Sequence, residues 1–384
     1  MDFVRTKEQR EQLSILQPYI TLFSNREQQL DKLYSFPFEN VKDLKDIGYT
    51  SWTVPKDEGG LGISLYDFLL LQEFIAEGDG ATALCIGWHL GIIHELSENR
   101  LWDKEIFSWL CKEVKNGALI NRAATERNTG SPTRGGKLET TAVQNGEMWM
   151  ISGRKTFTTM APALDYFIVS ASIEGTEVVG EFLVPRSTEG VSIEETWDSV
   201  SMRGTASHDL ILEQVAVPYK YLVEKISPSS IEKRRGWLLH IPACYLGIAE
   251  AARRYALQFA ATYQPNSLKA PIATVPNVQR LIGEIELELL QARSFLYSVA
   301  KRYEEENKQC MQAEMAAVKY TVTNAAISIV DKAMRIVGAR SLSEKNPLHR
   351  YYLHVRAGLH NPPMDDMTIS LLARHALQDF DFKK

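Results

Sequence analysis

The spacing of apolar residues changes twice along this chain, and that change most constrains its fold. In the first region apolar residues recur every three or four positions, as at Leu13, Leu16, Ile20 and Phe23, which is the spacing of one face of an amphipathic helix. In the middle region short segments alternate between apolar and polar residues, and afterwards the helical spacing returns. The pattern predicts a mostly helical protein with a central β domain.

Residues 1–116 are expected to form an N-terminal helical domain. A glycine-rich turn from Val54 to Gly62 interrupts its helical spacing, because glycine permits backbone conformations that other residues resist. After this turn the pattern predicts helices over residues 65–77, 81–99 and 104–115.

Residues 117–226 are expected to form a small antiparallel β barrel or sandwich. Segments such as 147–151, 166–170 and 191–195 alternate in the manner of half-buried strands. Turn dipeptides separate these segments, namely Asn145-Gly146, Glu174-Gly175 and Glu189-Gly190.

Residues 227–384 are expected to form an antiparallel helix bundle after a polar linker at residues 227–230. One long helical face is marked by Ile248, Ala252 and Phe259, and further faces follow at residues 282–289 and 326–333. Long helices joined by short loops are typical of such a bundle.

Composition excludes several classes of protein and partner. Of the 384 residues, 45% are hydrophobic and 24% are charged, which is typical of a globular protein with a large core. The net charge of −5 gives no reason to expect nucleic acid or an anionic membrane as partner. The four cysteines form no C-x-x-C pair, which argues against a disulfide framework or a metal site. Without an apolar signal core or an apolar run of the ~20 residues that a membrane span needs, a cytoplasmic protein is expected.

Two segments of the β region carry residues that suit a flat, hydrogen-bonding ligand. The first, residues 122–131, is rich in small hydroxyl residues and glycine, which leave backbone N–H groups free to face an acceptor-rich ring. The second, residues 151–159, contains Phe157 and Thr159, which point to the same side of a strand. An aromatic face beside a hydroxyl donor is a reasonable wall for a flavin, whereas either segment alone is also compatible with an ordinary surface hairpin.

Four segments together resemble the acyl-CoA dehydrogenase superfamily, in that family's order. Thr125-Glu126 followed by Gly130-Ser131 resembles its Thr-Glu-Pro-x-x-Gly-Ser-Asp signature, and residues 153–159 resemble its Gly-x-Lys-x-Trp-Ile-Thr-Asn segment. Residues 54–62 match its Pro-x-x-x-Gly-Gly-x-Gly turn, and residues 202–207 match its Met-Arg-x-Ser/Thr segment. The resemblance spans nearly the whole chain and implies the same order of helices, sheet and helix bundle.

The resemblance implies that FAD lies between the sheet and the C-terminal bundle. Thr125 and Ser131 would bind around the pyrimidine ring and the pyrophosphate. Phe157 would take the place of the usual tryptophan over the isoalloxazine, and Thr159 would hydrogen-bond near N5, the atom that accepts hydride. The flavin carries the redox chemistry, and the protein orients and tunes it.

Family members also bind the distal end of FAD with a neighbouring subunit, so the resemblance implies a homotetramer or a dimer. Their Gln-x-x-Gly-Gly-x-Gly turn corresponds to residues 335–341, where Arg335 replaces the glutamine and Gly338 is kept. Arg335 would pair with the pyrophosphate, or it is a solvated helix residue. Their Arg-x-Gln-Phe-Gly element, expected at residues 265–269, is missing, which makes FMN or a loosely bound reduced flavin the alternative to FAD.

The catalytic base of the family has no counterpart at its usual place. Dehydrogenation of an acyl-CoA needs a carboxylate that removes the α-proton, and the family carries it in a Tyr-Glu-Gly-Thr segment, where this chain has Asn361-Pro-Pro363. A few members place the base on the first bundle helix, a position near Trp237 here, with no acid beside it. Asp365 or Asp366 would substitute, or one of them caps the last helix.

The same loop carries a histidine that points to different chemistry. Gly358-Leu-His-Asn-Pro362 resembles a Leu-His-Asp-Pro segment of the dibenzothiophene monooxygenase-like flavoenzymes that share this fold, and His89 occupies the place of a second histidine in that branch. His360 and His89 would hydrogen-bond to a flavin C4a-hydroperoxide and move its proton near neutral pH. A histidine in an apolar helix is otherwise a core residue.

Three hypotheses about function remain open. The chain is an acyl-CoA dehydrogenase with an electron-transfer partner, a monooxygenase that receives reduced flavin from a separate reductase, or a non-catalytic binding module on the same fold. The whole-chain resemblance favours the dehydrogenase, whereas His89, His360 and the altered FAD turn favour the monooxygenase. Both enzymatic hypotheses make the protein a flavin-dependent oxidoreductase acting on a small molecule.

Overall fold

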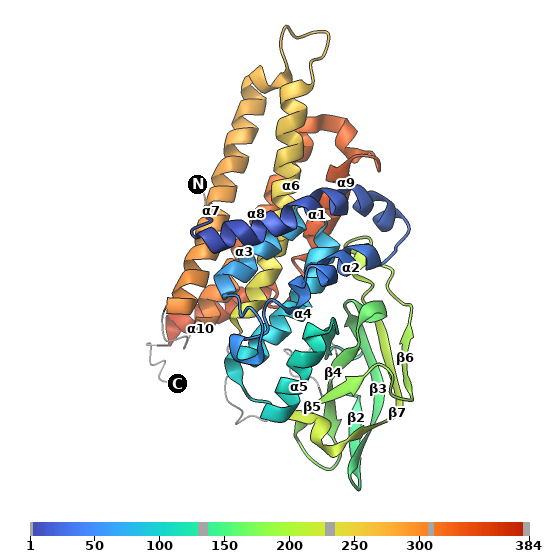
Figure 1. The fold of residues 1–384 in the computed structure, drawn as a ribbon. Coiled ribbons are helices and arrows are strands. Elements are labelled where there is room, and N and C mark those ends of the chain that lie inside the picture. Colours follow the sequence, from blue (N-terminus) through green and yellow to red (C-terminus); the bar gives the residue numbers. More distant parts are fainter. Residues whose placement is uncertain (1–2, 130–136, 227–234, 306–310, 379–384) are drawn as a thin grey trace, which may run out of the picture.

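A computed structural model describes residues 3–129, 137–226, 235–305 and 311–378 of the chain. These residues form an N-terminal group of helices, a β sheet and a C-terminal group of helices, in that order (Figure 1). The predicted fold class, mostly helical with a central β domain, is confirmed. Within the described ranges, no helix is both long enough and apolar enough to cross a bilayer.

The N-terminal helices follow the predicted pattern closely. They are α1 (Lys7–Lys32), α2 (Phe38–Asp46), α3 (Leu65–Ala76), α4 (Gly80–Asn99) and α5 (Lys104–Lys115). The side chains of Ser64, Asp79 and Asp103 accept hydrogen bonds from first-turn amides of α3, α4 and α5. Such caps satisfy N–H groups that have no partner within the helix, which explains why these helices begin where they do.

The middle of the chain forms one mixed sheet. Its strands are β1 (Ile120–Ala123), β2 (Thr141–Asn145), β3 (Met148–Thr158), β4 (Tyr166–Ile173), β5 (Val179–Pro185), β6 (Val191–Glu194), β7 (His208–Pro218) and β8 (Leu222–Ile226). Their order is β6-β7-β3-β2-β4-β5-β8, with β1 beside β4. Most neighbours are antiparallel, as predicted, but β1 and β2 run parallel to β4. The alternation within a single strand does not reveal such pairings between distant segments.

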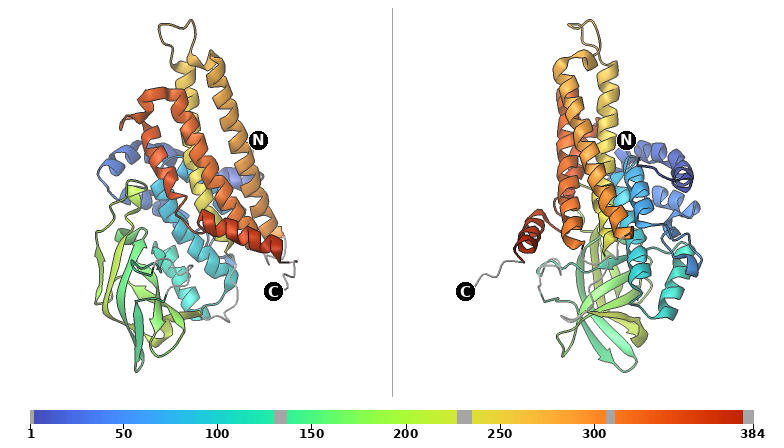
Figure 2. Two further views of the ribbon diagram at one scale, coloured as in Figure 1. Left: turned by 180° about the vertical axis from the view of Figure 1, so that it is seen from behind. Right: turned by 90° about the vertical axis from the view of Figure 1, so that its left-hand side faces the viewer.

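The C-terminal helices form a bundle that shares its core with the N-terminal helices. They are α6 (His240–Thr262), α7 (Pro276–Glu305), α8 (Gln312–Val337), α9 (Pro347–Ala357) and α10 (Asp365–Leu377). Figures 1 and 2 show α6, α7 and α8 side by side as long rods, and α8 packs against both of the others. The N-terminal helix α3 packs on α6, while α10 lies against α8 and projects from the body (Figure 2).

The closest contact between the two helical parts lies where α3 crosses α6. A Cβ atom at Gly247 of α6 would lie 2.1 Å from the carbonyl oxygen of Glu73 in α3, so the crossing requires glycine. The Glu73 carboxylate also forms an ion pair with Arg293 of α7 at 2.6 Å and accepts a hydrogen bond from the Tyr297 hydroxyl at 2.5 Å. One residue of α3 therefore contacts both α6 and α7.

Replacing Gly247 by alanine is expected to lower the free energy of unfolding by about 1–3 kcal/mol, because the added methyl group must push α6 away from α3. Gly283 is the matched control, since it is exposed within α7 and a Cβ there meets no atom within 4 Å. Gly283→Ala should raise stability by up to ~1 kcal/mol through helix propensity alone. Urea denaturation measures both changes, and a Gly247→Ala variant as stable as the wild type would contradict this packing.

Candidate functional site

A buried ion pair joins the two segments that the sequence singled out. The Lys155 ammonium of β3 lies 2.6 Å from the Glu126 carboxylate, and the two side chains are 0% and 1% exposed. Glu126 also accepts hydrogen bonds from the Thr129 hydroxyl and from the backbone amides of residues 139 and 140. Burial alone would raise the pKa of Glu126, but the bonds from Lys155 and the amides lower it to about 2. The carboxylate is therefore ionised and fully bonded.

The backbones of the two segments lie side by side. The Thr156 amide donates to the Thr125 carbonyl oxygen at 2.9 Å, which places the partly exposed Thr125 beside the end of β3. The part of the chain that the structure describes resumes after residue 136, so Ser131 lies outside it. The flavin contacts predicted for Thr125 and Ser131 stay predictions.

Phe157 is presented to solvent at the end of β3. Its side chain is 60% exposed, its φ is 56°, and the buried Thr158 separates it from the partly exposed Thr159. A positive φ is unfavourable for a bulky residue and persists where the surroundings impose it. The Thr159 amide donates to the Phe157 carbonyl at 2.9 Å, and the Trp197 ring packs edge-on against Phe157 at 5.9 Å.

Thr159 is held by contacts on both its backbone and its hydroxyl. The Asn121 side-chain amide donates to the Thr159 carbonyl at 2.9 Å, and the Thr159 hydroxyl lies 3.0 Å from the Ser207 hydroxyl. A rigid, exposed aromatic face beside a fixed hydroxyl suits a flat ring with a polar edge. We name Thr125, Phe157 and Thr159, with the Glu126–Lys155 pair behind them, the flavin wall, because this donor set fits a flavin.

His89 makes structural contacts. It is 0% exposed; its Nε2 lies 2.8 Å from the Thr50 carbonyl, and its Nδ1 accepts from the Ile120 amide at 3.1 Å. Burial lowers the pKa of His89 to about 4, so the ring is neutral with its proton on Nε2. Both nitrogens are engaged, and these contacts do not support the catalytic role predicted for His89. They fit the alternative of a core histidine.

The loop after α9 carries His360 and a neutral amide where the family has its base. His360 is exposed. The buried Tyr245 of α6 donates its hydroxyl proton to Asn361 Oδ1 at 2.5 Å, so this amide is fixed and cannot take a proton from carbon. Trp237, at the family's other base position, is buried between Trp88 and His240 at ring distances of 5.6 and 5.8 Å.

Asp365 is bound by side chains rather than acting as a cap. The N-cap of α10 is Met364, which makes no side-chain cap, so the prediction that Asp365 or Asp366 caps this helix is wrong. The Asp365 carboxylate lies 3.4 Å from the Lys319 ammonium and accepts from the Asn324 amide at 3.0 Å. These long-range partners compete successfully with the helix amides, while Asp366 is exposed.

Arg335 and Gly338 lie at the C-terminal end of α8. The Arg335 side chain is 65% exposed and pairs with Asp331 one turn earlier at 2.7 Å, as a solvated helix residue does. Gly338 has a φ of 71° and ends the helix. The flavin contacts predicted for these two residues, to the cofactor of a neighbouring subunit, stay predictions.

Sequence reasoning missed several residues that shape this site. Asn121, Trp197 and Tyr245 contact Thr159, Phe157 and Asn361 across long sequence separations. None of the three stands in a segment with a recognisable motif. Ser207 ended the segment at residues 202–207, but its position beside Thr159 had no local signal.

Three family models match the chain. They are the acyl-CoA dehydrogenase N-terminal domain over residues 19–98, the middle domain over 121–215 and the C-terminal domain over 239–361. YdbM, a putative acyl-CoA dehydrogenase of Bacillus subtilis (strain 168), is 52% identical over 377 residues, which cover 98% of this chain and 99% of the relative.

Solved structures show the same fold. Butyryl-CoA dehydrogenase from Megasphaera elsdenii superposes with a TM-score of 0.87 at 19% identity, covering 98% of this chain and 100% of that one. Dibenzothiophene monooxygenase (TdsC) from Paenibacillus sp. A11-2 superposes with a TM-score of 0.81 at 19% identity, covering 95% and 97%.

Glu126→Gln is expected to destabilise the protein by roughly 3 kcal/mol, because it leaves the Lys155 ammonium buried without a counter-ion. Since the pKa of Glu126 is lowered from 4.5 to about 2, the wild-type pair contributes fully above pH 4.5 and is lost as the pH falls towards 2. Glu126→Gln should therefore lose part of this acid dependence, as measured by urea denaturation between pH 3 and 7.

The double variant Glu126→Gln/Lys155→Met is the control, because it removes the unpaired ammonium as well. It should recover much of the lost stability. If the two single changes and the double change add without coupling, the ion pair does not join the segments energetically.

Proposed function

We propose, because this chain belongs to the acyl-CoA dehydrogenase family, that it is a flavin-dependent oxidoreductase that removes hydrogen from Cα and Cβ of an acyl-CoA thioester. The observation that carries the proposal is the buried Glu126–Lys155 pair, which joins both flavin segments beside the exposed Phe157 ring. The family binds FAD, and FMN or a loosely bound reduced flavin is the alternative here.

The residues of the flavin wall bind and orient. FAD, when bound, supplies the hydride acceptor. Phe157 would cover one face of the ring, and Thr159 and Thr125 would meet its polar edge. The contacts of Asn121 and Trp197 keep Thr159 and Phe157 in place before any ligand arrives. A preorganised wall lowers the entropy that binding costs.

We propose Asp365 as the group that removes the α-proton. It lies within four residues of Asn361, the family's base position. Lys319 and Asn324 hold its two carboxylate oxygens in one orientation, which a general base requires. Burial lowers the pKa of Lys319, and the charge of Asp365 opposes this shift.

A reduced-flavin monooxygenase is the second candidate, and Asn361 favours it. Its side chain is a neutral amide fixed by Tyr245, so the loop offers hydrogen-bonding groups where a dehydrogenase has a carboxylate. The exposed His360 in the same loop would donate to an oxygen species and return its proton. This reaction would need a separate reductase, whereas the dehydrogenase would need an electron-transfer partner.

We also propose a homo-oligomer, a dimer or a tetramer. Arg335 and Gly338 occupy the place where family members contact a neighbouring subunit's flavin, and Arg335 is exposed in the single chain. Helix α10 projects from the body and leaves Ile369 and Leu377 exposed, and apolar residues of this kind are suited to a subunit contact.

Asp365→Asn is expected to slow bleaching of bound FAD by an acyl-CoA about 100- to 10,000-fold, because a general base contributes that much to proton removal. The measurement is the absorbance of oxidised flavin after anaerobic addition of a panel of acyl-CoAs. Asp366→Asn is the matched control, since Asp366 is exposed. Bleaching of Asp365→Asn at the wild-type rate would exclude Asp365 as the base.

His360→Ala tests the second candidate. If His360 manages the oxygen chemistry, the variant should lose oxygenated product while its reduced flavin still reacts with oxygen. Product analysis with a supplied reductase measures this, and His375→Ala, another exposed histidine, is the control. An unchanged product yield would remove His360 from the mechanism.

A further inference from the structure

Three hydroxyl groups form a chain from the interior to the flavin wall. The Thr205 hydroxyl lies 2.9 Å from the Met202 carbonyl oxygen, Ser207 lies 2.9 Å from Thr205, and Thr159 lies 3.0 Å from Ser207. Thr205 and Ser207 are buried, whereas Thr159 is partly exposed. The open end of the hydroxyl chain is therefore Thr159.

The carbonyl at the inner end fixes the direction of every proton in the hydroxyl chain. A carbonyl oxygen only accepts, so Thr205 donates its single proton to Met202. Thr205 is then the acceptor for Ser207, and Ser207 is the acceptor for Thr159. The Thr159 proton points inwards to Ser207, which leaves the lone pairs of its oxygen facing the open side.

We propose that Thr159 serves the ligand as a hydrogen-bond acceptor, so that the flavin wall binds reduced flavin in preference to oxidised flavin. The inference rests on the proposed function, because it concerns the flavin assigned there. It also reverses the hydroxyl donor that the sequence suggested at Thr159.

The chemistry of the flavin ring connects an acceptor to one redox state. The oxidised ring presents bare nitrogen acceptors along its central edge, and two-electron reduction with uptake of protons converts such an acceptor into an N–H donor. An acceptor in the wall completes a hydrogen bond only with the reduced form. Against the oxidised form, two sets of lone pairs oppose each other.

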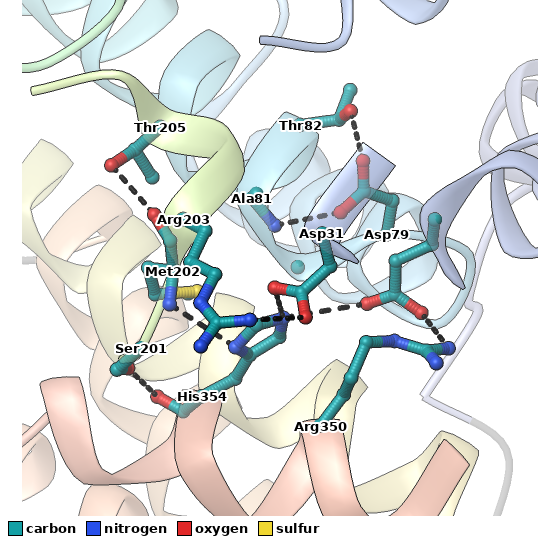
Figure 3. Close-up of polar contacts among 12 residues, drawn as sticks. Asp31, Asp79, Ala81, Thr82, Ser201, Met202, Arg203, Thr205, Arg350 and His354 are labelled. Atoms are coloured by element: carbon teal, nitrogen blue, oxygen red, sulfur yellow. Dashed lines mark hydrogen bonds and ion pairs between the residues drawn. The ribbon is translucent and has the colours of Figure 1, made fainter. Parts of the chain in front are cut away.

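The inner end of the hydroxyl chain cannot easily turn. Figure 3 shows the Met202 amide donating to Nδ1 of His354 in α9, at 3.1 Å. The Ser201 hydroxyl donates to the His354 carbonyl at 3.4 Å, and Arg203 pairs with Asp31 of α1 at 3.6 Å (Figure 3). Segment 201–203 is thus held by helices from both ends of the chain, and it keeps the Met202 carbonyl in place.

His354 keeps its acceptor available over the working range of pH. Burial, with the charges of Arg350 and Arg203, lowers the pKa of His354 to about 3. The ring is therefore neutral, and because Nδ1 accepts from Met202, its proton is on Nε2. This proton faces the carboxylates of Glu27 and Asp31, at 3.6 and 3.8 Å.

The Met202 carbonyl receives donors only. Besides the Thr205 hydroxyl it accepts from the Thr205 amide at 3.0 Å and from the Trp197 indole N–H at 3.3 Å. Its site remains an acceptor site in every arrangement of the three hydroxyl protons. The same carbonyl also fixes Trp197, whose ring packs on Phe157, so the hydroxyl chain and the aromatic face share one support.

The test compares the dissociation constants of wild-type protein for oxidised FAD and for anaerobically reduced FAD. Wild type should bind reduced FAD about tenfold more tightly, the usual effect of one hydrogen bond gained rather than opposed. By linkage, a tenfold ratio raises the midpoint potential of bound FAD by about 30 mV over free FAD, which spectroelectrochemistry measures independently. Equal or tighter binding of oxidised FAD would overturn the inference.

Ser207→Ala tests the direction of the hydroxyl chain. Without Ser207, the Thr159 proton is free to turn outwards, so the preference for reduced FAD should fall about tenfold towards the oxidised form. Ser152→Ala is the matched control, because Ser152 is a hydroxyl residue of β3 whose oxygen accepts from Gln214 instead. An unchanged ratio in Ser207→Ala would overturn the inference.

The wild-type ratio stands without any variant, so a Ser207→Ala protein that fails to fold leaves a decisive measurement. Thr159→Val, which removes the open end of the hydroxyl chain, should likewise abolish the preference. A wild-type protein that binds neither form of FAD would overturn the proposed function itself, and the inference with it.

Discussion

The ion pair between Glu126 and Lys155 is the interaction on which the rest of the site depends. Two charges that are almost completely buried remain in a protein only when each is paired and hydrogen-bonded, and Glu126 meets both conditions with Lys155 and two backbone amides. The pair fixes the register between the segment after β1 and the end of β3. It thereby holds the exposed Phe157 and the hydroxyl of Thr159 beside Thr125.

A second polar group supports the same wall from the opposite side. Glu27 pairs with Arg350 at 2.8 Å, and His354 one turn later accepts from the Met202 backbone. Helices α1 and α9, from the two ends of the chain, therefore meet segment 201–203 of the sheet domain (Figure 3). Orientation at Thr159 is a property of all three parts of the fold, because no single part contains the complete set of contacts.

The sequence predicted what local pattern determines. Helical spacing located α3, α4 and α5, turn dipeptides indicated the strands, and four short segments identified the acyl-CoA dehydrogenase family, which the family models confirm. Long-range choices stayed hidden. Neither the parallel pairing of β1 with β4, the backbone contacts that engage both His89 nitrogens, nor the preference of Asp365 for Lys319 over its own helix has a signal in neighbouring residues.

A crystal structure of the protein loaded with FAD would test the central claim, that the flavin wall is where the cofactor ring binds. The account predicts the ring with one face on Phe157 and a polar edge at Thr159, with the Glu126–Lys155 pair unchanged behind it. A ring bound elsewhere on the molecule, with Phe157 still exposed to solvent, would contradict it.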